Sequence, residues 1–266
     1  MNLFKKSNII VAGLLLACVS TTSAHIGYTG RDFGTFAGNG SEASVTISSN
    51  TVTGDFGWAG GTDANLGDSH KTRAFKFSLL ATGLVTLELQ GLDIIRSGVP
   101  ISALPHPGFS IFKGLAASGA HDQSAASTAY NNATYGVGNW EGSFNALGDW
   151  AVGVDGAPAD SPLSYFTYVA NAADGIAANY GNAAGIRGDG VADGFVKSSF
   201  VLGPGDYSIF VGGADISGNS TSSFAFNATL SVVPEPSTDV LLALGTLVTI
   251  VVAHRMIARG RFPSRI

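Results

Sequence analysis

Short apolar runs recur along the chain with the period of a β-strand, and glycine, asparagine and aspartate stand between them. Phe75, Phe77 and Leu79 occupy alternate positions, as do Phe224 and Phe226. A period of two places such side chains on one face of a strand. No amphipathic helical period is sustained over comparable lengths. The pattern predicts strands at residues 43–48, 73–79, 85–90, 108–112, 163–169, 198–202, 207–212 and 223–232.

Many short strands with turn residues between them are typical of a β-sandwich or barrel. We therefore predict an all-β fold for residues 25–232, a jelly-roll-like sandwich with long loops rich in Gly, Ala, Ser and Asn. Residues 170–180 are predicted to hold a short helix, and residues 114–138 a long loop.

The N-terminal segment has the three parts of a secretory signal. Lys5 and Lys6 precede an apolar run over residues 9–19, and a small, polar stretch ends at Ala24. This run is shorter than the ~20 residues needed to span a membrane. We expect signal peptidase to remove residues 1–24 and leave His25 as the first residue. Cys18 is the single cysteine and lies inside this signal, as part of an alternative lipoprotein box, so the mature chain has no disulfide.

The C-terminal segment is predicted to be one transmembrane helix over about residues 238–258. Its aliphatic run at 240–253 is followed by arginines at positions 255, 259, 261 and 265. At ~1.5 Å per residue such a helix reaches about 30 Å, which is enough to span a bilayer. Basic residues favour the cytoplasmic side, so residues 25–232 are expected outside the inner membrane.

Val233, Pro234, Glu235, Pro236 and Ser237 precede this helix. The motif, the helix and the basic end together resemble the PEP-CTERM sorting tail of Gram-negative bacteria. The resemblance covers residues 233–266. It implies an exosortase-type processing enzyme as partner and delivery to the envelope surface or an extracellular polymer.

The match departs from that family at two places. Asp239 stands where the family has an apolar residue, and the arginines are dispersed. A plain single-pass anchor is the alternative.

A second resemblance concerns the body of the chain. Residues 73–90, the strand at 107–112 and the turn Pro204-Gly205 before Tyr207 are similar to bacterial pre-peptidase C-terminal domains. That family implies a jelly-roll sandwich linked to carbohydrate or surface attachment.

Charge narrows the classes of function. Residues 24–237 carry eight Lys and Arg against 18 Asp and Glu, a formal charge of −10. Binding to nucleic acid or to an anionic membrane requires a basic face, so both are excluded as the main function.

No catalytic motif emerges, since the sequence has no G-x-S-x-G, H-E-x-x-H or phosphate loop. Asp68, Ser69 and His70 resemble part of the nucleophile block of GDSL hydrolases, but the Asp-x-x-His pair that such enzymes need is absent. We expect a noncatalytic protein with a loop at this position.

Two patterns offer metal ligands. His25 would present its α-amine and ring nitrogen, which with a second imidazole form a copper-binding histidine brace, as in lytic polysaccharide monooxygenases and periplasmic copper carriers. His70 is the preferred second ligand, with His106 and His121 behind it.

The other pattern is a Gly-rich loop. Asp189 and Asp193 offer the oxygen donors that Ca²⁺ accepts, although a solvated turn explains them equally simply.

Three tryptophans, Trp58, Trp140 and Trp150, suggest a sugar-stacking platform, but such residues are more often part of a core. The sequence thus predicts a noncatalytic surface or extracellular-matrix protein associated with exopolysaccharide. The alternatives are a copper-binding protein and a carbohydrate-binding module.

Overall fold

The computed structural model describes residues 26–37, 42–59, 66–117, 120–121, 125–135, 142–154, 158, 160–176, 180, 185–234 and 249–255. The described residues contain helix α1 (Ala125–Tyr135) and a second short helix at residues 249–255. The strands are β1 (Asp32–Phe36), β2 (Ala43–Thr53), β3 (Leu66–Asp68), β4 (Arg73–Leu79), β5 (Gly83–Gly91), β6 (Ile94–Arg96), β7 (Val99–Ala103), β8 (Pro107–Lys113), β9 (Ala120–His121), β10 (Ser143–Asn145), β11 (Trp150–Val154), β12 (Ser164–Ala173), β13 (Phe195–Leu202), β14 (Gly205–Gly213) and β15 (Ser223–Pro234).

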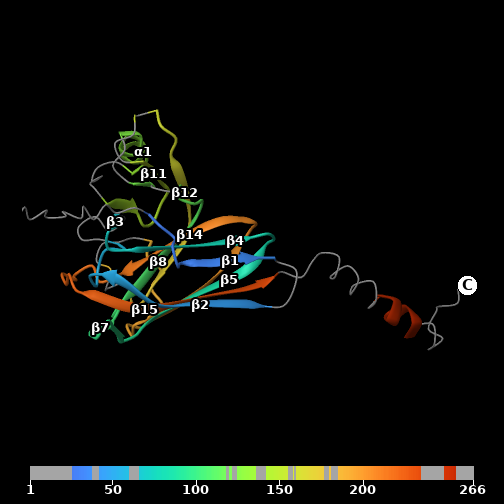
Figure 1. Ribbon diagram of the computed structural model, residues 1–266. Helices are drawn as coiled ribbons and strands as arrows, with labels where there is room; N and C mark the ends of the chain where they lie inside the picture. Colours follow the sequence, from blue (N-terminus) through green and yellow to red (C-terminus); the bar gives the residue numbers. More distant parts are fainter. Residues whose placement is uncertain are drawn as a thin grey trace, which may run out of the picture.

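These strands build two large sheets that pack face to face (Figure 1). The inner sheet has seven strands in the order β1-β4-β14-β8-β12-β11-β9. The outer sheet has six, with β15 pairing with β5, β7 and β2, β13 beyond β5 and β6 beyond β7. All pairings in the inner sheet are antiparallel except that of β1 with β4, which is parallel. The prediction of an all-β sandwich is therefore confirmed.

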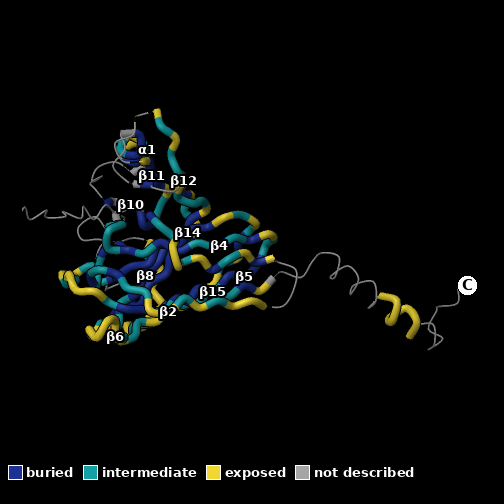
Figure 2. The backbone as a smooth tube through the Cα atoms, in the orientation of Figure 1, coloured by how far each residue is buried: buried dark blue, intermediate teal, exposed yellow. Residues whose placement is uncertain are grey.

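The central core lies between the two sheets and follows the alternation of the sequence. In β4 the rings of Phe75 and Phe77 and the side chain of Leu79 are buried there, and in β5 Leu87 and Leu89 meet them. Figure 2 shows this layer as the dark interior of the sandwich. Burial of this many large apolar side chains is the main term that stabilises a chain without disulfides.

A second cluster covers the opposite face of the inner sheet. Successive residues of β8 point to opposite faces, so Phe109 and Ile111 join the central core while Phe112 joins the second cluster. Strands β8 and β14 are therefore buried on both faces. The second cluster consists of Ile26, Trp58, Ala59, Ala74, Phe112, Ala120, Phe144, Ala146, Trp150, Val152, Phe166, Ala173, Tyr180, Phe210 and Ala214.

The solvent face of the outer sheet consists largely of short hydroxyl side chains. Thr86 on β5 and Ser199 on β13 are hydrogen-bonded across the strands, with their oxygens 2.7 Å apart. Thr46 on β2 and Thr229 on β15 make the same contact at 2.8 Å. Along these strands, solvent-facing hydroxyl side chains therefore alternate with apolar side chains that face the core, and the hydroxyl pairs join neighbouring strands.

All eight predicted strands are present, several of them longer than predicted. Two predictions were wrong. The helix expected over residues 170–180 is replaced through Ala173 by β12, which pairs with β8, because buried cross-strand packing outweighs the helix propensity of alanine. The loop expected over residues 114–138 contains β9 and α1.

The predicted signal peptide, its cleavage site at Ala24-His25, and Glu235, Pro236 and Ser237 lie outside the described residues. Val233 and Pro234 are the last residues of β15 and pair with Leu84 and Gly83. The strand therefore extends two residues beyond the domain boundary predicted at 232. Within the part of the chain that the structure describes, no helix is long and apolar enough to cross a membrane, and most of the predicted span at 238–258 falls outside it.

Candidate functional site

The candidate site lies at one end of the inner sheet, where β4 and β8 begin and β12 and β14 end. Arg73 at the start of β4 pairs with Val211 near the end of β14. Pro107 at the start of β8 pairs with Gly213 at the end of β14, and Ala173 at the end of β12 pairs with Gly108. Segments that lead into or out of these strands therefore gather at this end, and they carry His70 and His106.

The N-terminal segment of the described chain is fixed over the second-cluster face of the inner sheet. The Arg31 side chain donates from Nε to the carbonyl of Ala74, at 2.9 Å, and from its terminal nitrogen to the carbonyl of Gly27, at 2.6 Å. The amide of Ile26 donates to the carbonyl of Ala120 at 3.2 Å. Ile26 and Ala120 are both buried in the second cluster, so this segment is part of the packed structure.

Two histidines adjoin that bonded pair in the sequence: His25 precedes Ile26, and His121 follows Ala120. His25 lies outside the described residues, and so does the side chain of His121, whose backbone belongs to β9.

His70 is held by its neighbour Asp68 in the turn between β3 and β4. One carboxylate oxygen of Asp68 accepts the backbone amide of His70 at 3.0 Å and lies 3.2 Å from the ring Nδ1. The other oxygen is 3.3 Å from the Nζ of Lys71. The imidazole side chain retains 32% of its exposure, which leaves it partly open to solvent. A carboxylate that fixes one ring nitrogen is the usual arrangement around metal-binding histidines.

Gly142 approaches the same Nδ1 edge of this imidazole as Asp68. The backbone carbonyl of Gly142 accepts the amide of Ser69 at 2.6 Å, and its φ of +87° favours glycine. A side chain at this position would collide with the ring of His70. The Nδ1 edge of the His70 ring is thus enclosed by Asp68 and by the backbone of residue 142.

His106 has a similar arrangement at the start of β8. Its Nδ1 lies 3.4 Å from a carboxylate oxygen of Asp174, which is completely buried, and its backbone carbonyl accepts the amide of Ala214. The Nδ1 atom is buried and makes no hydrogen bond. Burial raises the pKa of Asp174, amides of Asp193 and Gly194 lower it in part, and the carboxylate of Asp189 raises it again.

His70 and His106 lie in separate turns, one leading into β4 and the other into β8. The backbone links between the turns run from Asp68 to Gly57, from Gly57 to Gly213 and from Gly213 to Pro107. At about 4.8 Å for each lateral step, the path along these links is roughly 14 Å. No group of three or more His, Cys, Asp or Glu side chains within the described residues is placed to hold a metal ion.

The two aspartates predicted as calcium ligands bind backbone amides. One oxygen of Asp189 accepts the amides of Gly175 at 3.0 Å and of Val191 at 3.2 Å. One oxygen of Asp193 accepts the amide of Phe195 at 3.1 Å. Both residues are exposed, and neither belongs to a group of three or more His, Cys, Asp or Glu placed to hold a metal among the described residues. Asp174 and Tyr180, which no sequence motif indicates, are buried beside this loop.

Two of the three tryptophans considered for a sugar-stacking platform are core residues. Trp58 and Trp150 are fully buried in the second cluster. Trp58 donates from its indole nitrogen to the hydroxyl of Ser110 at 2.8 Å, and Trp150 stacks on Phe166 with ring centroids 4.6 Å apart. Neither ring has an open face for a pyranose, because both serve the core. Trp140 lies outside the described residues.

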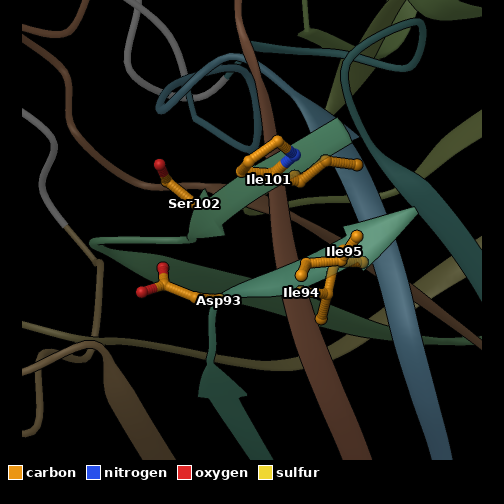
Figure 3. Close-up of a pocket in the computed structure, with 6 residues that line it drawn as sticks. Asp93, Ile94, Ile95, Ile101 and Ser102 are labelled. Atoms are coloured by element: carbon orange, nitrogen blue, oxygen red, sulfur yellow. The ribbon is translucent and has the colours of Figure 1, made fainter. Parts of the chain in front are cut away.

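A shallow pocket of about 410 Å³ lies on the β6–β7 hairpin (Figure 3). Its lining is largely aliphatic and includes Ile94, Ile95 and Ile101. The one carboxylate in it, Asp93, accepts the amide of Ala103 at 2.7 Å. None of the histidines or tryptophans singled out in the sequence lines this pocket, and its residues offer no metal-binding or catalytic pair.

No model of a known protein family matches this chain, and no curated protein matches it in sequence. Two solved structures are similar in chain path. One is the copper-binding, surface-associated protein CorA, described as important in copper acquisition by Methylomicrobium album BG8. It is 18% identical with a TM-score of 0.45, and the match covers 75% of this chain and 98% of CorA. The other is MopE, a secreted protein of Methylococcus capsulatus in which an oxidized tryptophan facilitates copper binding. It is 17% identical with a TM-score of 0.39, and the match covers 77% of this chain and 87% of MopE.

Proposed function

We propose that this chain is an exported surface protein that binds copper through His70 and through His25 at its mature N-terminus. The observation that carries the proposal is the His70 imidazole, which Asp68 holds by Nδ1 and which stays partly open to solvent. The remaining ring nitrogen is then available to a metal ion, and the carboxylate fixes both the ring orientation and the tautomer.

Both proposed ligands adjoin segments that pack on the second cluster: Ile26 belongs to it, and Gly67 lies against Phe144. β1 pairs with β4 in parallel, and a turn closed by the amide of Arg31 on the carbonyl of Tyr28 connects β1 to residues 26–28, which reach Ala120. His70 lies in the segment that precedes β4. Ile26, the residue after His25, begins the described part of the segment that precedes β1. A brace formed by the two histidines needs His25 to reach the turn that holds His70.

The donor set suits copper. An α-amine and two imidazoles are nitrogen donors, which bind copper better than they bind hard cations such as Ca²⁺. No thiolate competes with them, because the mature chain has no cysteine. His121 is the candidate for a further ligand, since it follows Ala120, which is bonded to Ile26. The proposal rests on these residues and not on the distant likeness in chain path.

We further propose that the chain reaches the cell surface by its sorting tail. Val233 and Pro234 terminate β15, so the motif over residues 233–237 begins where the folded domain ends. An exosortase-type enzyme would recognise this motif at the inner membrane and release the domain to the envelope surface or an extracellular polymer. In this role the protein is noncatalytic and associates with exopolysaccharide.

A copper titration of the protein, purified from cells that export and process it, tests the metal proposal. We expect one tightly bound copper per chain. His70→Ala and His25→Ala should each weaken binding by about tenfold or more, as loss of a ligand or its support does. His106→Ala, in the separate turn that leads into β8, is the matched control and should retain binding. Full copper binding by His70→Ala would overturn the proposal.

A further inference from the structure

Asp174 is a completely buried carboxylate at the end of β12. Its two oxygens accept the backbone amides of Asp193, at 3.0 Å, and of Gly194, at 2.8 Å. Each oxygen retains a second lone pair after one hydrogen bond. Among the described ion pairs its only partner is the imidazole of His106, and no lysine or arginine neutralises it. A buried anion with so little compensation is unfavourable unless a proton or a cation accompanies it.

Asp189 supplies a second carboxylate from the exposed loop that covers Asp174. The loop is tied to the end of β12 because Ala173 donates to the carbonyl of Arg187 and accepts the amide of Asp189. One oxygen of Asp189 accepts the amide of Gly175, the residue next to Asp174. Both carboxylates are therefore held at one turn of the chain, with Asp174 buried and Asp189 exposed to solvent.

Tyr180 places a buried phenol hydroxyl beside these carboxylates. The residue is 1% exposed and its hydroxyl has no hydrogen-bond partner. Its ring lies against Gly188, where an added Cβ would come within 2.9 Å of Cε2. Burial raises the pKa of this phenol, and the charges of Asp189 and then Asp174 raise it further. An added Cβ at Gly188 would also meet the carbonyl of Gly175, so this edge of the ring lies between the residues next to Asp189 and Asp174. A buried hydroxyl without a partner is rare in folded proteins and commonly marks the position of a bound water or ion.

We propose that Asp174, Asp189 and Tyr180 form a binding site for a hard divalent cation of the Ca²⁺ type beneath the loop at residues 187–194. Ca²⁺ takes carboxylate, carbonyl, hydroxyl and water oxygens in flexible geometry, and extracellular modules bind it with ordinary affinities of roughly 10⁻⁴–10⁻³ M. Two carboxylates balance its charge, and the phenol oxygen adds a neutral donor. In an exported chain without disulfides, the ion would clamp the loop to the end of β12.

This site shares only Asp189 with the calcium site expected from the sequence. Asp193 is not part of it, and its carboxylate accepts the amide of Phe195 at the start of β13. Asp174, the residue after β12, takes its place, and Tyr180 is an additional ligand. The site is also independent of the proposed copper site, since its ligands are oxygens and its position is beyond Pro107 on the far side from His70.

Calcium-dependent unfolding and terbium luminescence test the proposal on the full exported protein. After EDTA treatment, added Ca²⁺ should raise the Tm in a concentration-dependent way, because an ion that binds only the native state stabilises it by mass action. Tb³⁺ should bind and emit on excitation of the aromatic residues, and Ca²⁺ should displace it. Tyr180→Phe should weaken Ca²⁺ binding several-fold.

Exposed loop variants separate a specific site from general acidity. Asp189→Asn should weaken Ca²⁺ binding by about tenfold, since it removes a ligand charge from a surface position without unfolding the core. Asp193→Asn, in the same loop, should leave binding unchanged. Asp174→Asn should abolish binding, and the Asp189 comparison holds even if that variant fails to fold. Absence of any Ca²⁺ effect on the wild-type Tm, or equal losses in the Asp189 and Asp193 variants, would overturn the proposal.

Discussion

The two apolar clusters on opposite faces of the inner sheet differ in what they contain and in how they are closed. The central core is aliphatic and phenylalanine-rich and is sealed by the regular strands of the outer sheet. The second cluster holds the buried tryptophans and Tyr180, and buried polar groups such as Ser110 and Asn131 lie beside it. It is covered by short strands, α1 and loops.

This difference assigns separate roles to the two faces. An apolar core sealed by strands stabilises the fold without offering any chemistry, whereas buried polar groups under loops can hold ligands. His70, His106, Asp174 and Tyr180 all lie in or beside the segments that close the second cluster. The two metal sites that we propose therefore belong to the same side of the inner sheet.

Truncation in the central core should have the largest effect. Leu87 is fully buried on β5, and Leu87→Ala should lower the free energy of unfolding by about 2–5 kcal/mol through lost burial and a residual cavity. Leu84 is 39% exposed on the same strand, and Leu84→Ala should change it by only about 0.5 kcal/mol. Urea unfolding of both variants measures the contrast, and equal losses would contradict the assignment of the core face.

A buried polar residue should come next. The side chain of Asn131 donates to the carbonyl of Ala151 at 3.0 Å and accepts its amide at 2.9 Å. Asn131→Ala leaves both backbone groups without a partner, at a cost of about 1–3 kcal/mol each before relaxation. Hydrogen exchange should show faster opening of β11 and α1 while β5 and β15 keep their protection. Uniform acceleration across both sheets would mean that the two clusters unfold as one.

The support of the proposed copper ligand gives a smaller effect. Asp68→Asn keeps the size of the side chain but weakens its hold on the His70 ring, so copper affinity should fall by about 10–100-fold with little change in Tm. The matched control is Asp215→Asn, whose carboxylate accepts the amide and hydroxyl of Ser217 on an exposed turn. If a copper titration gives the same affinity for Asp68→Asn and wild type, then Asp68 does not orient His70 for copper binding.

The smallest effect is expected on the solvent face of the outer sheet. Thr86→Ala removes one cross-strand hydroxyl contact with Ser199, which is worth about 0.2–1 kcal/mol. Copper and calcium affinities should be unchanged, because neither proposed site touches this face. A loss of metal binding in this variant would show that the two faces are coupled.

The sequence predicts the central core well because its residues alternate along single strands. Phe75, Phe77 and Leu79 can be assigned to one face from their spacing alone. Strand β8 also packs on the second cluster, but the polar residue Ser110 between Phe109 and Ile111 suggests from the sequence that this face of β8 is exposed. The structure shows Ser110 buried. A strand that is buried on both faces does not show the alternation of a half-exposed strand.

The candidate sites could be predicted only in part. The sequence indicates His70 as an imidazole that could join His25. Asp68, which contacts its ring, lies only two residues away in the sequence. Asp174 and Tyr180 were missed because their roles depend on the loop at residues 187–194 folding back on β12, a long-range contact that no local pattern encodes. The helix predicted at 170–180 failed for the same reason, since pairing with β8 decides the conformation there.

The proposed copper site is tested most directly by the intact mass of the exported protein, measured under native conditions after growth with copper. The account predicts a chain that begins at His25 and retains one copper ion, and predicts that a single extra residue before His25 removes that ion. A chain that begins at His25 and carries no copper, although copper was supplied, would contradict it.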